Sequence, residues 1–116
     1  MSQRFILEKC VCDVLLLFDC LCQAPKPPKA VCALSQLESQ YDLLLLKRVY
    51  FSCVEEGLLE LRPCRTERNK LVLPDLANIK HHRVLRVTSK GYRFLDESRC
   101  GRLPRQFKNA LSTLTD

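Results

Sequence analysis

The sequence has few glycines, few prolines and no long apolar run. Its 116 residues include 3 glycines and 6 prolines, while 47% are hydrophobic and 28% are charged. This balance argues against a disordered or low-complexity chain. No apolar run approaches the roughly 18 residues of a membrane-spanning helix, so no transmembrane helix is expected. The length instead suits one globular domain with a single hydrophobic core.

The apolar N-terminal segment MSQRFILEKCVCDVLLLFDCLC lacks the features of a signal peptide. Glu8, Asp13 and Asp19 interrupt its apolar stretch, and no small-residue cleavage site follows. We therefore expect a cytoplasmic protein that does not associate with a membrane.

Cysteine is abundant, with residues Cys10, Cys12, Cys20, Cys22, Cys32, Cys53, Cys64 and Cys100. Disulfides would need an oxidising compartment. A zinc site needs C-x2-4-C pairs on turns. Here the pairs are C-x-C within one expected helix, where residues two apart point about 200° from each other. We expect reduced, buried thiols that act as small apolar side chains, with a redox role or a metal site as alternatives. No metal or other cofactor is expected.

Charge is distributed unevenly along the chain. Residues 58–116 hold thirteen Lys and Arg against six Asp and Glu, a net charge of +7, whereas residues 1–57 hold six against seven, a net charge of −1. A basic half on a small domain is compatible with binding of nucleic-acid phosphates. The alternative is a solvated surface that keeps a small protein soluble.

The first expected helix covers residues 4–23. Its apolar arc is wider than a one-sided surface helix needs, because Cys12, Leu16 and Cys20 lie on its otherwise polar hemisphere. This helix is therefore expected to be covered on more than one side. The prolines of residues 24–29 end it.

Two more helices are expected before the pattern changes at residue 58. A short one covers residues 30–39, and Asp42 is a plausible N-cap for the next, which stops at Gly57. Leu44 and Leu45 cannot both share the core face of this third helix, so at least one is expected to be exposed or at an interface.

Alternation predicts three short strands, at residues 58–64, 70–74 and 84–88. Residues 65–69 form a charged turn between the first two, and Pro63 ends the first. His81 and His82 are expected to be solvent-exposed loop residues.

Two helices are expected after the strands. Thr88 caps the first, which Gly101 ends, and Gly91 lies in its first turn, where a missing side chain lets the helix approach the sheet. Pro104 is well placed to open a last helix through about Leu114.

Two segments carry a family resemblance. CVEEGLLEL, residues 53–61, resembles the end of the third helix and the first wing strand of winged helix-turn-helix proteins, usually L-x-E-x-G-L-I-E. LRVTSKGYRFLDESR, residues 85–99, resembles their post-wing L-T-x-x-G-x-x-F-L signature, in particular that of small phage and bacterial members. The resemblance implies one α+β winged-helix domain over residues 1–116. Its parts are a helical region at 1–57, a β-wing at 58–88 and C-terminal helices at 89–116.

The family's third helix enters the major groove of DNA, and its wing touches the backbone or the minor groove. The resemblance thus implies a small DNA-binding transcriptional regulator of prokaryotic or phage origin, with double-stranded DNA as partner. The expected contact residues are Gln40, Tyr41, Lys47, Arg48, Arg62, Arg65, Arg68 and Lys70. Asp42 and the leucines at 43–46 are poorly suited to reading bases. The alternatives are a module that binds a host protein and a charged hairpin that only resists edge pairing.

Surplus apolar residues on the terminal helices predict a homodimer. The expected interface residues are Cys12, Leu16, Cys20, Phe107, Leu111 and Leu114. The alternative is that the last helix packs on the first within one chain. The chain has no Gly-rich phosphate loop, H-E-x-x-H or G-x-S-x-G motif, so we expect no enzyme.

Overall fold

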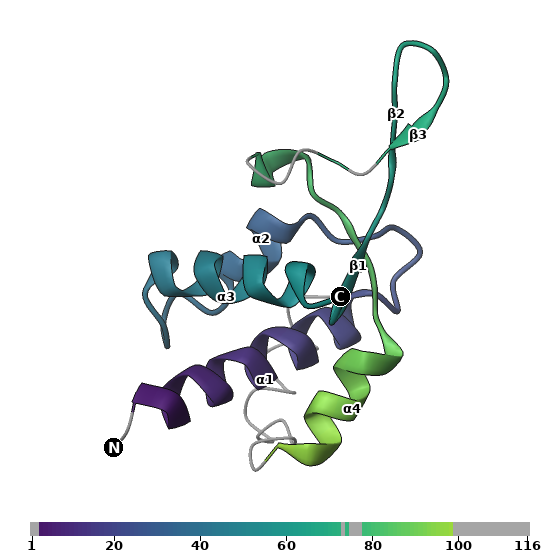
Figure 1. The fold of residues 1–116 in the computed structure, drawn as a ribbon. Helices are drawn as coiled ribbons and strands as arrows, with labels where there is room; N and C mark the ends of the chain where they lie inside the picture. Colours follow the sequence, from purple (N-terminus) through teal and green to yellow (C-terminus); the bar gives the residue numbers. More distant parts are fainter. Residues whose placement is uncertain (1–2, 73, 75–77, 99–116) are drawn as a thin grey trace.

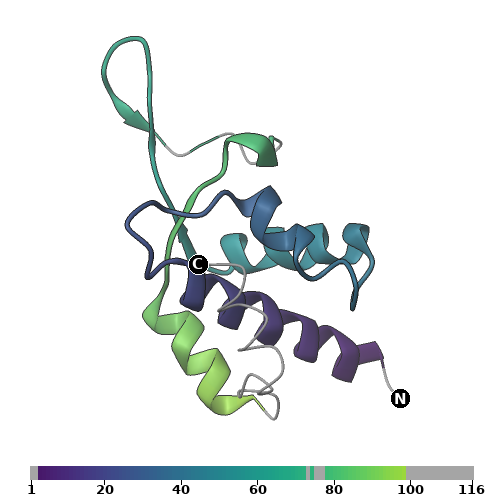
Figure 2. The same ribbon diagram turned by 180° about the vertical axis from the view of Figure 1, so that it is seen from behind.

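Helix α1 (Gln3–Leu21) lies between α3 (Leu43–Glu55) on one side and α4 (Ser89–Glu97) on the other (Figures 1 and 2). The computed structural model describes residues 3–72, 74 and 78–98 and has an α+β fold. Its elements in chain order are α1 (Gln3–Leu21), α2 (Ala30–Ser35), α3 (Leu43–Glu55), β1 (Leu59–Leu61), β2 (Cys64–Arg65), β3 (Leu71–Val72), the 3-10 helix η1 (Ile79–His81), β4 (Val84–Val87) and α4 (Ser89–Glu97). Over the described part of the chain, no helix combines the length and apolar character needed to cross a membrane.

Helix α1 is buried on nearly all of its sides. Residues 12–15 and 17–18 are all buried, although successive residues of a helix point about 100° apart. This is the multiple coverage that the wide apolar arc of the sequence predicts. The neighbours that provide it are α2, α3, β4 and α4.

The side of α1 expected to carry a dimer interface is partly covered by α4. Cys12 is fully buried, and its Sγ lies 2.9 Å from the Oγ of Ser98 at the end of α4. The same Ser98 hydroxyl donates to Glu8 at 2.9 Å. The prediction of Cys12 as an interface residue is therefore wrong, because this chain already covers it. Leu16 and Cys20 are half-buried and pack against the core.

The expected helix ends are largely found where glycine and proline place them. Helix α3 ends in a Schellman motif: Gly57 has φ +76°, its N–H bonds to the Val54 carbonyl at 3.1 Å, and the Leu58 N–H bonds to the Cys53 carbonyl at 2.8 Å. Asp42 is the N-cap of α3 as predicted, but its side chain makes no capping hydrogen bond. The expected helix at 30–39 is shorter, since turns follow the end of α2.

The central sheet is an antiparallel pair of β1 and β4. Leu59 lies opposite Val87, Glu60 opposite Arg86, and Leu61 opposite Val84. Lys29 bridges Arg83, and the Val84 N–H bonds to the Pro28 carbonyl at 3.1 Å, so the segment before α2 lies along the other edge of β4. The expected strand at 58–64 divides in two around Pro63, because proline cannot donate to a ladder.

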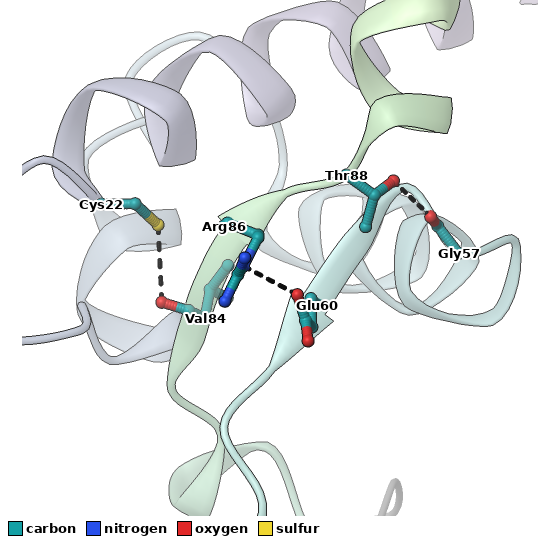
Figure 3. Close-up of polar contacts among 6 residues, drawn as sticks. All are labelled: Cys22, Gly57, Glu60, Val84, Arg86 and Thr88. Carbon is teal, nitrogen blue, oxygen red and sulfur yellow. Dashed lines mark hydrogen bonds and ion pairs between the residues drawn. The ribbon is translucent and has the colours of Figure 1, made fainter.

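Polar contacts hold β1, β4 and the flanking helices in place (Figure 3). Arg86 forms an exposed ion pair with Glu60, with Nε and Oε2 2.8 Å apart. The Cys22 thiol donates to the Val84 carbonyl at 3.4 Å. The Thr88 hydroxyl donates to the Gly57 carbonyl at 2.5 Å. The last contact joins the end of α3 to the start of α4.

Thr88 and Gly91 set the approach of α4 to the sheet, as the sequence predicts. The Thr88 Oγ1 accepts the Gly91 N–H at 3.1 Å and so caps α4. A Cβ on Gly91 would lie 2.5 Å from the Leu58 carbonyl oxygen and 2.6 Å from a Val87 methyl carbon. Only glycine fits this position without displacing the helix.

Several sequence predictions concern residues after 98, which the structure does not describe. The expected end of α4 at Gly101 is wrong, because Ser98 already has an extended backbone. The last helix from Pro104 and the interface residues Phe107, Leu111 and Leu114 lie outside the described residues. Helix α4 itself ends at Glu97.

Substitution of Gly91 by alanine is expected to destabilise the fold by about 1–3 kcal/mol, because the added methyl group would overlap a backbone carbonyl. Urea unfolding followed by circular dichroism measures this loss. The exposed Ser89→Ala on the same helix is the control and should change stability by less than about 0.5 kcal/mol. Equal unfolding midpoints for Gly91→Ala and the unaltered protein would contradict the close packing.

Candidate nucleic-acid interface

The hairpin formed by residues 62–72 extends away from the helices (Figures 1 and 2). Its strands β2 and β3 pair antiparallel. At the tip, the Thr66 N–H bonds to the Lys70 carbonyl and the Asn69 N–H to the Thr66 carbonyl, both at 2.9 Å. Asn69 has φ 62°, a left-handed conformation that asparagine tolerates better than most residues. The tip is therefore an ordered turn.

This hairpin carries the expected wing cations. These four side chains are exposed: Arg62, Arg65, Arg68 and Lys70. Glu67 is the single acid of residues 62–72, which leaves a net charge of +3 on this segment. One guanidinium is oriented along the hairpin, since the Arg65 Nη1 donates to the Asn69 Oδ1 at 2.8 Å. A projection of this shape and charge can reach anionic groups without a change in the core.

The segment that leads into β4, which bonds to Arg62 at the base of the hairpin, contains a buried histidine. His82 is fully buried, and its Nδ1 is hydrogen-bonded to the Tyr50 hydroxyl of α3 at 2.7 Å. The Phe51 ring meets the His82 ring edge to face. The prediction of His82 as a solvent-exposed loop residue is wrong, whereas His81 is exposed as expected. One signal in the sequence could have indicated that His82 is buried. Tyr50 lies on the core face of α3, and a buried tyrosine hydroxyl usually needs a polar partner.

A second contact holds the connection into β4. The Arg83 Nη1 donates to the Pro27 carbonyl at 2.8 Å, and the Ala30 N–H bonds to the His82 carbonyl at 3.0 Å. The cation of Arg83 is thus used within the fold, unlike those of the tip. The hairpin has a fixed base and a free end.

The N-terminal half of α3 presents a mixed surface. Leu44 is 65% exposed, which confirms that at least one of the central leucines faces outward, and Leu43 is 40% exposed. Arg48 and Gln40 are exposed, while Lys47 is half-buried. Helix α3 begins on the side away from the hairpin (Figures 1 and 2). The two expected groups of DNA contacts therefore form separate surfaces.

Tyr41 is bonded to helix α1 within the fold. It is half-buried, and its hydroxyl donates to the Asp13 carboxylate of α1 at 2.5 Å. Burial raises the pKa of the Asp13 carboxyl, while the Tyr41 hydrogen bond and the charge of Lys9 act in the opposite direction. Sequence periodicity places Asp13 on the solvent side of α1, whereas the fold covers it with Tyr41. The expected role of Tyr41 as a DNA contact stays a prediction, with its hydroxyl already bonded to Asp13.

The seven described cysteines are all free thiols. Cys10 and Cys53 are buried, and loss of solvent raises the pKa of each to about 12. Cys32 is exposed, so the expectation of general burial does not hold for every thiol. Residues 3–72, 74 and 78–98 contain no group of three or more His, Cys, Asp or Glu side chains placed to hold a metal ion.

No protein-family model, no curated protein and no solved structure matches this chain. Its function is therefore inferred from its own side chains. The hairpin with its four exposed cations is the feature whose exposure and charge the core does not require.

Alkylation of the folded protein with iodoacetamide should modify Cys32 first, while Cys10 and Cys53 react only after unfolding, because burial removes access and keeps both thiols protonated. Peptide mapping by mass spectrometry identifies the modified residues, and Cys32→Ser should remove the fast step. Alkylation of Cys53 at the rate of Cys32 would contradict the packing described.

Replacing Tyr50 with phenylalanine should cost about 1–3 kcal/mol of stability, because the buried His82 Nδ1 loses its hydrogen-bond partner. Chemical unfolding measures the loss. Tyr92→Phe is a matched control: it removes a hydroxyl whose bond to Asp19 is exposed, so its effect should be smaller. Similar losses in both variants would contradict a larger stabilising contribution from the buried Tyr50–His82 hydrogen bond.

Proposed function

We propose that this chain is a winged-helix protein that binds double-stranded DNA, with the hairpin of residues 62–72 as its main contact. The element order supports the proposal, since three helices precede the hairpin and α4 follows it. The bridge between Lys29 and Arg83 adds support, because it ties the segment before α2 to the strand that leaves the hairpin. In such a fold, a wing outside the core is the natural place for a nucleic-acid contact.

The observation that carries the proposal is the cationic, protruding hairpin. DNA phosphates attract Lys and Arg through counterion release, which needs accessible cations but no particular base sequence. Four exposed cations and one acid on a single projecting segment provide such a surface.

Helix α3 contributes less than its position in a winged helix suggests. Arg48, Lys47 and Gln40 can add contacts to phosphate, but Leu43 and Leu44 offer no hydrogen bonds to base edges. We therefore propose that binding is directed mainly to the DNA backbone. A regulator of this kind would act on transcription by occupying or reshaping DNA more than by reading a long site.

A protein-binding role is the second candidate, and the exposed leucines of α3 favour it. Leu43 and Leu44 lie side by side in the sequence at the start of the helix, where no described element buries them. Apolar side chains in such a position suit a contact with another protein. Their replacement by serine should weaken a protein contact and leave binding to DNA unchanged.

The homodimer stays a prediction with a reduced set of interface residues. Cys12 is removed from that set by its burial, while Leu16 and Cys20 are half-buried. Light scattering at micromolar concentration tests the assembly, since a mass of 13.4 kDa corresponds to one chain.

Reversal of two hairpin charges, Arg65→Glu with Arg68→Glu, should weaken binding to random-sequence duplex DNA by at least about tenfold at low salt, because two phosphate contacts become repulsive. Fluorescence anisotropy with a labelled duplex measures the change. Both residues lie on the exposed hairpin, so the melting temperature of this variant should equal that of the unaltered protein.

The matched control is Lys90→Glu with Arg93→Glu on α4, which changes the net charge equally but away from the hairpin. This variant should keep its affinity within about threefold. Equal losses in the two double variants would show that overall charge, and not the hairpin, determines binding.

A further inference from the structure

Three cations from distant parts of the chain lie side by side across the central sheet. Lys29 precedes α2, Arg62 follows β1 and Arg83 precedes β4. Lys29 and Arg83 are partners in an antiparallel bridge. On the other edge of the same strand, the Arg62 N–H bonds to the Arg83 carbonyl at 2.8 Å. These three residues form a basic row, with Arg83 in its centre.

The backbone places the side chains of the basic row on one face of the sheet. Hydrogen bonds of 3.0 and 3.1 Å flank the Lys29–Arg83 bridge on both sides. This is the pattern of a non-hydrogen-bonded pair, whose Cα atoms lie about 4.5 Å apart, whereas hydrogen-bonded neighbours such as Arg62 and Arg83 lie about 5.5 Å apart. Directly opposite residues of neighbouring strands project to the same face. Lys29 and Arg62 are exposed and Arg83 is half-buried, so the row faces solvent.

No acid compensates the charge of the basic row within the described part of the chain. The two ion pairs found there use other cations, since they join Arg86 to Glu60 and Lys90 to Glu56. The segments that carry the row contain no Asp or Glu, namely residues 24–29, 61–66 and 78–86. Like charges directly opposite each other destabilise a sheet. The row therefore costs stability unless an anion binds over it.

The central side chain of the row is oriented by the fold. The Arg83 Nη1 donates to the Pro27 carbonyl at 2.8 Å. This bond fixes the guanidinium but leaves its charge uncancelled, because a carbonyl group is neutral. The other N–H donors of the guanidinium form part of a planar fork that matches the oxygens of a phosphate group.

We propose that the basic row is a phosphate-binding site separate from the hairpin tip, and that it takes a ligand with two or more linked phosphate groups. The Cα atoms of the row span about 10 Å, which is wider than one phosphate group. Such groups occur in small polyphosphate compounds and in the backbone of a nucleic acid. Arg62 and Arg65 are about 10 Å apart along an extended strand, so a small ligand on the row does not reach residues 66–70 at the tip.

Thermal unfolding with inorganic tripolyphosphate tests the site, with sodium chloride of equal ionic strength as the reference. The row variant is Lys29→Gln with Arg62→Gln, and no hydrogen bond of the described structure uses either side chain. Its control is Arg68→Gln with Lys70→Gln at the hairpin tip, which changes the net charge equally.

Tripolyphosphate at about ten times its Kd should raise the melting temperature of the unaltered protein and of the tip variant by about 5 °C or more. The row variant should show less than half of this rise. Without the anion, at low salt, the row variant should melt above the unaltered protein, because Arg83 loses two repulsive neighbours. If the double variant does not fold, Lys29→Gln alone should show both effects at smaller size.

Fluorescence anisotropy with a labelled random-sequence duplex identifies the source of the phosphate groups. A loss of affinity in the row variant, with a salt slope smaller by about 2, would assign the row to the nucleic-acid backbone. Lys90→Gln with Arg93→Gln on α4 is the control for this measurement and should bind like the unaltered protein. A row variant that binds duplex normally but has lost the response to tripolyphosphate would assign the row to a small polyphosphate compound.

Three results would overturn the proposal. One is a row variant that keeps both the duplex affinity and the tripolyphosphate response of the unaltered protein. Another is an equal loss of the tripolyphosphate response in the tip variant, since overall charge would then explain it. The third is a row variant that melts below the unaltered protein without the anion, because its charges would then be compensated within the fold. Absence of duplex binding in every form would contradict DNA binding by the hairpin but not a row on which tripolyphosphate acts.

Discussion

The burial of α1 on nearly all of its sides is the constraint on which the rest of this structure depends. Residues 12–15 are buried in succession, so the chain must place elements around the whole helix. Helix α3 and β4 cover one part, and α4 covers another. Helix α4 reaches its place only because Gly91 allows it to meet the Leu58 carbonyl. The buried apolar side chains belong to this arrangement of helices and strands, and the hairpin of residues 62–72 lies outside it.

The hairpin is divided between a base held by the fold and a free end, and this division separates the exposed charges from the core. His82 and Tyr50 join the base to α3 inside the core, while the cations of the tip face solvent. Binding residues placed on a projecting segment do not compete with core packing, so their charge can be high. The same arrangement leaves Leu71 and Val72 uncovered.

Local signals in the sequence predicted the elements, whereas contacts between distant residues could not be predicted. Gly57, Thr88 and Gly91 act on their own neighbourhoods, and each is found in the role that its type indicates. Periodicity places Asp13 on the more polar side of its helix, and His82 is expected in solvent, because a local pattern does not show which distant side chain will cover a polar residue. Their partners, Tyr41 and Tyr50, lie 28 and 32 residues away in the sequence. The sequence correctly predicts a charged, exposed hairpin, but it does not predict the outward position of the β3 residues.

The dependence of DNA binding on salt tests the central claim most directly. If the four hairpin cations hold phosphates, the logarithm of the association constant for random-sequence duplex should fall linearly with the logarithm of salt concentration, with a slope of about −3 to −4. Contacts from Arg48 or Lys47 would make the slope steeper. A slope near zero, or no measurable binding at low salt, would contradict a function based on phosphate contacts and would favour the leucines of α3 as the functional surface.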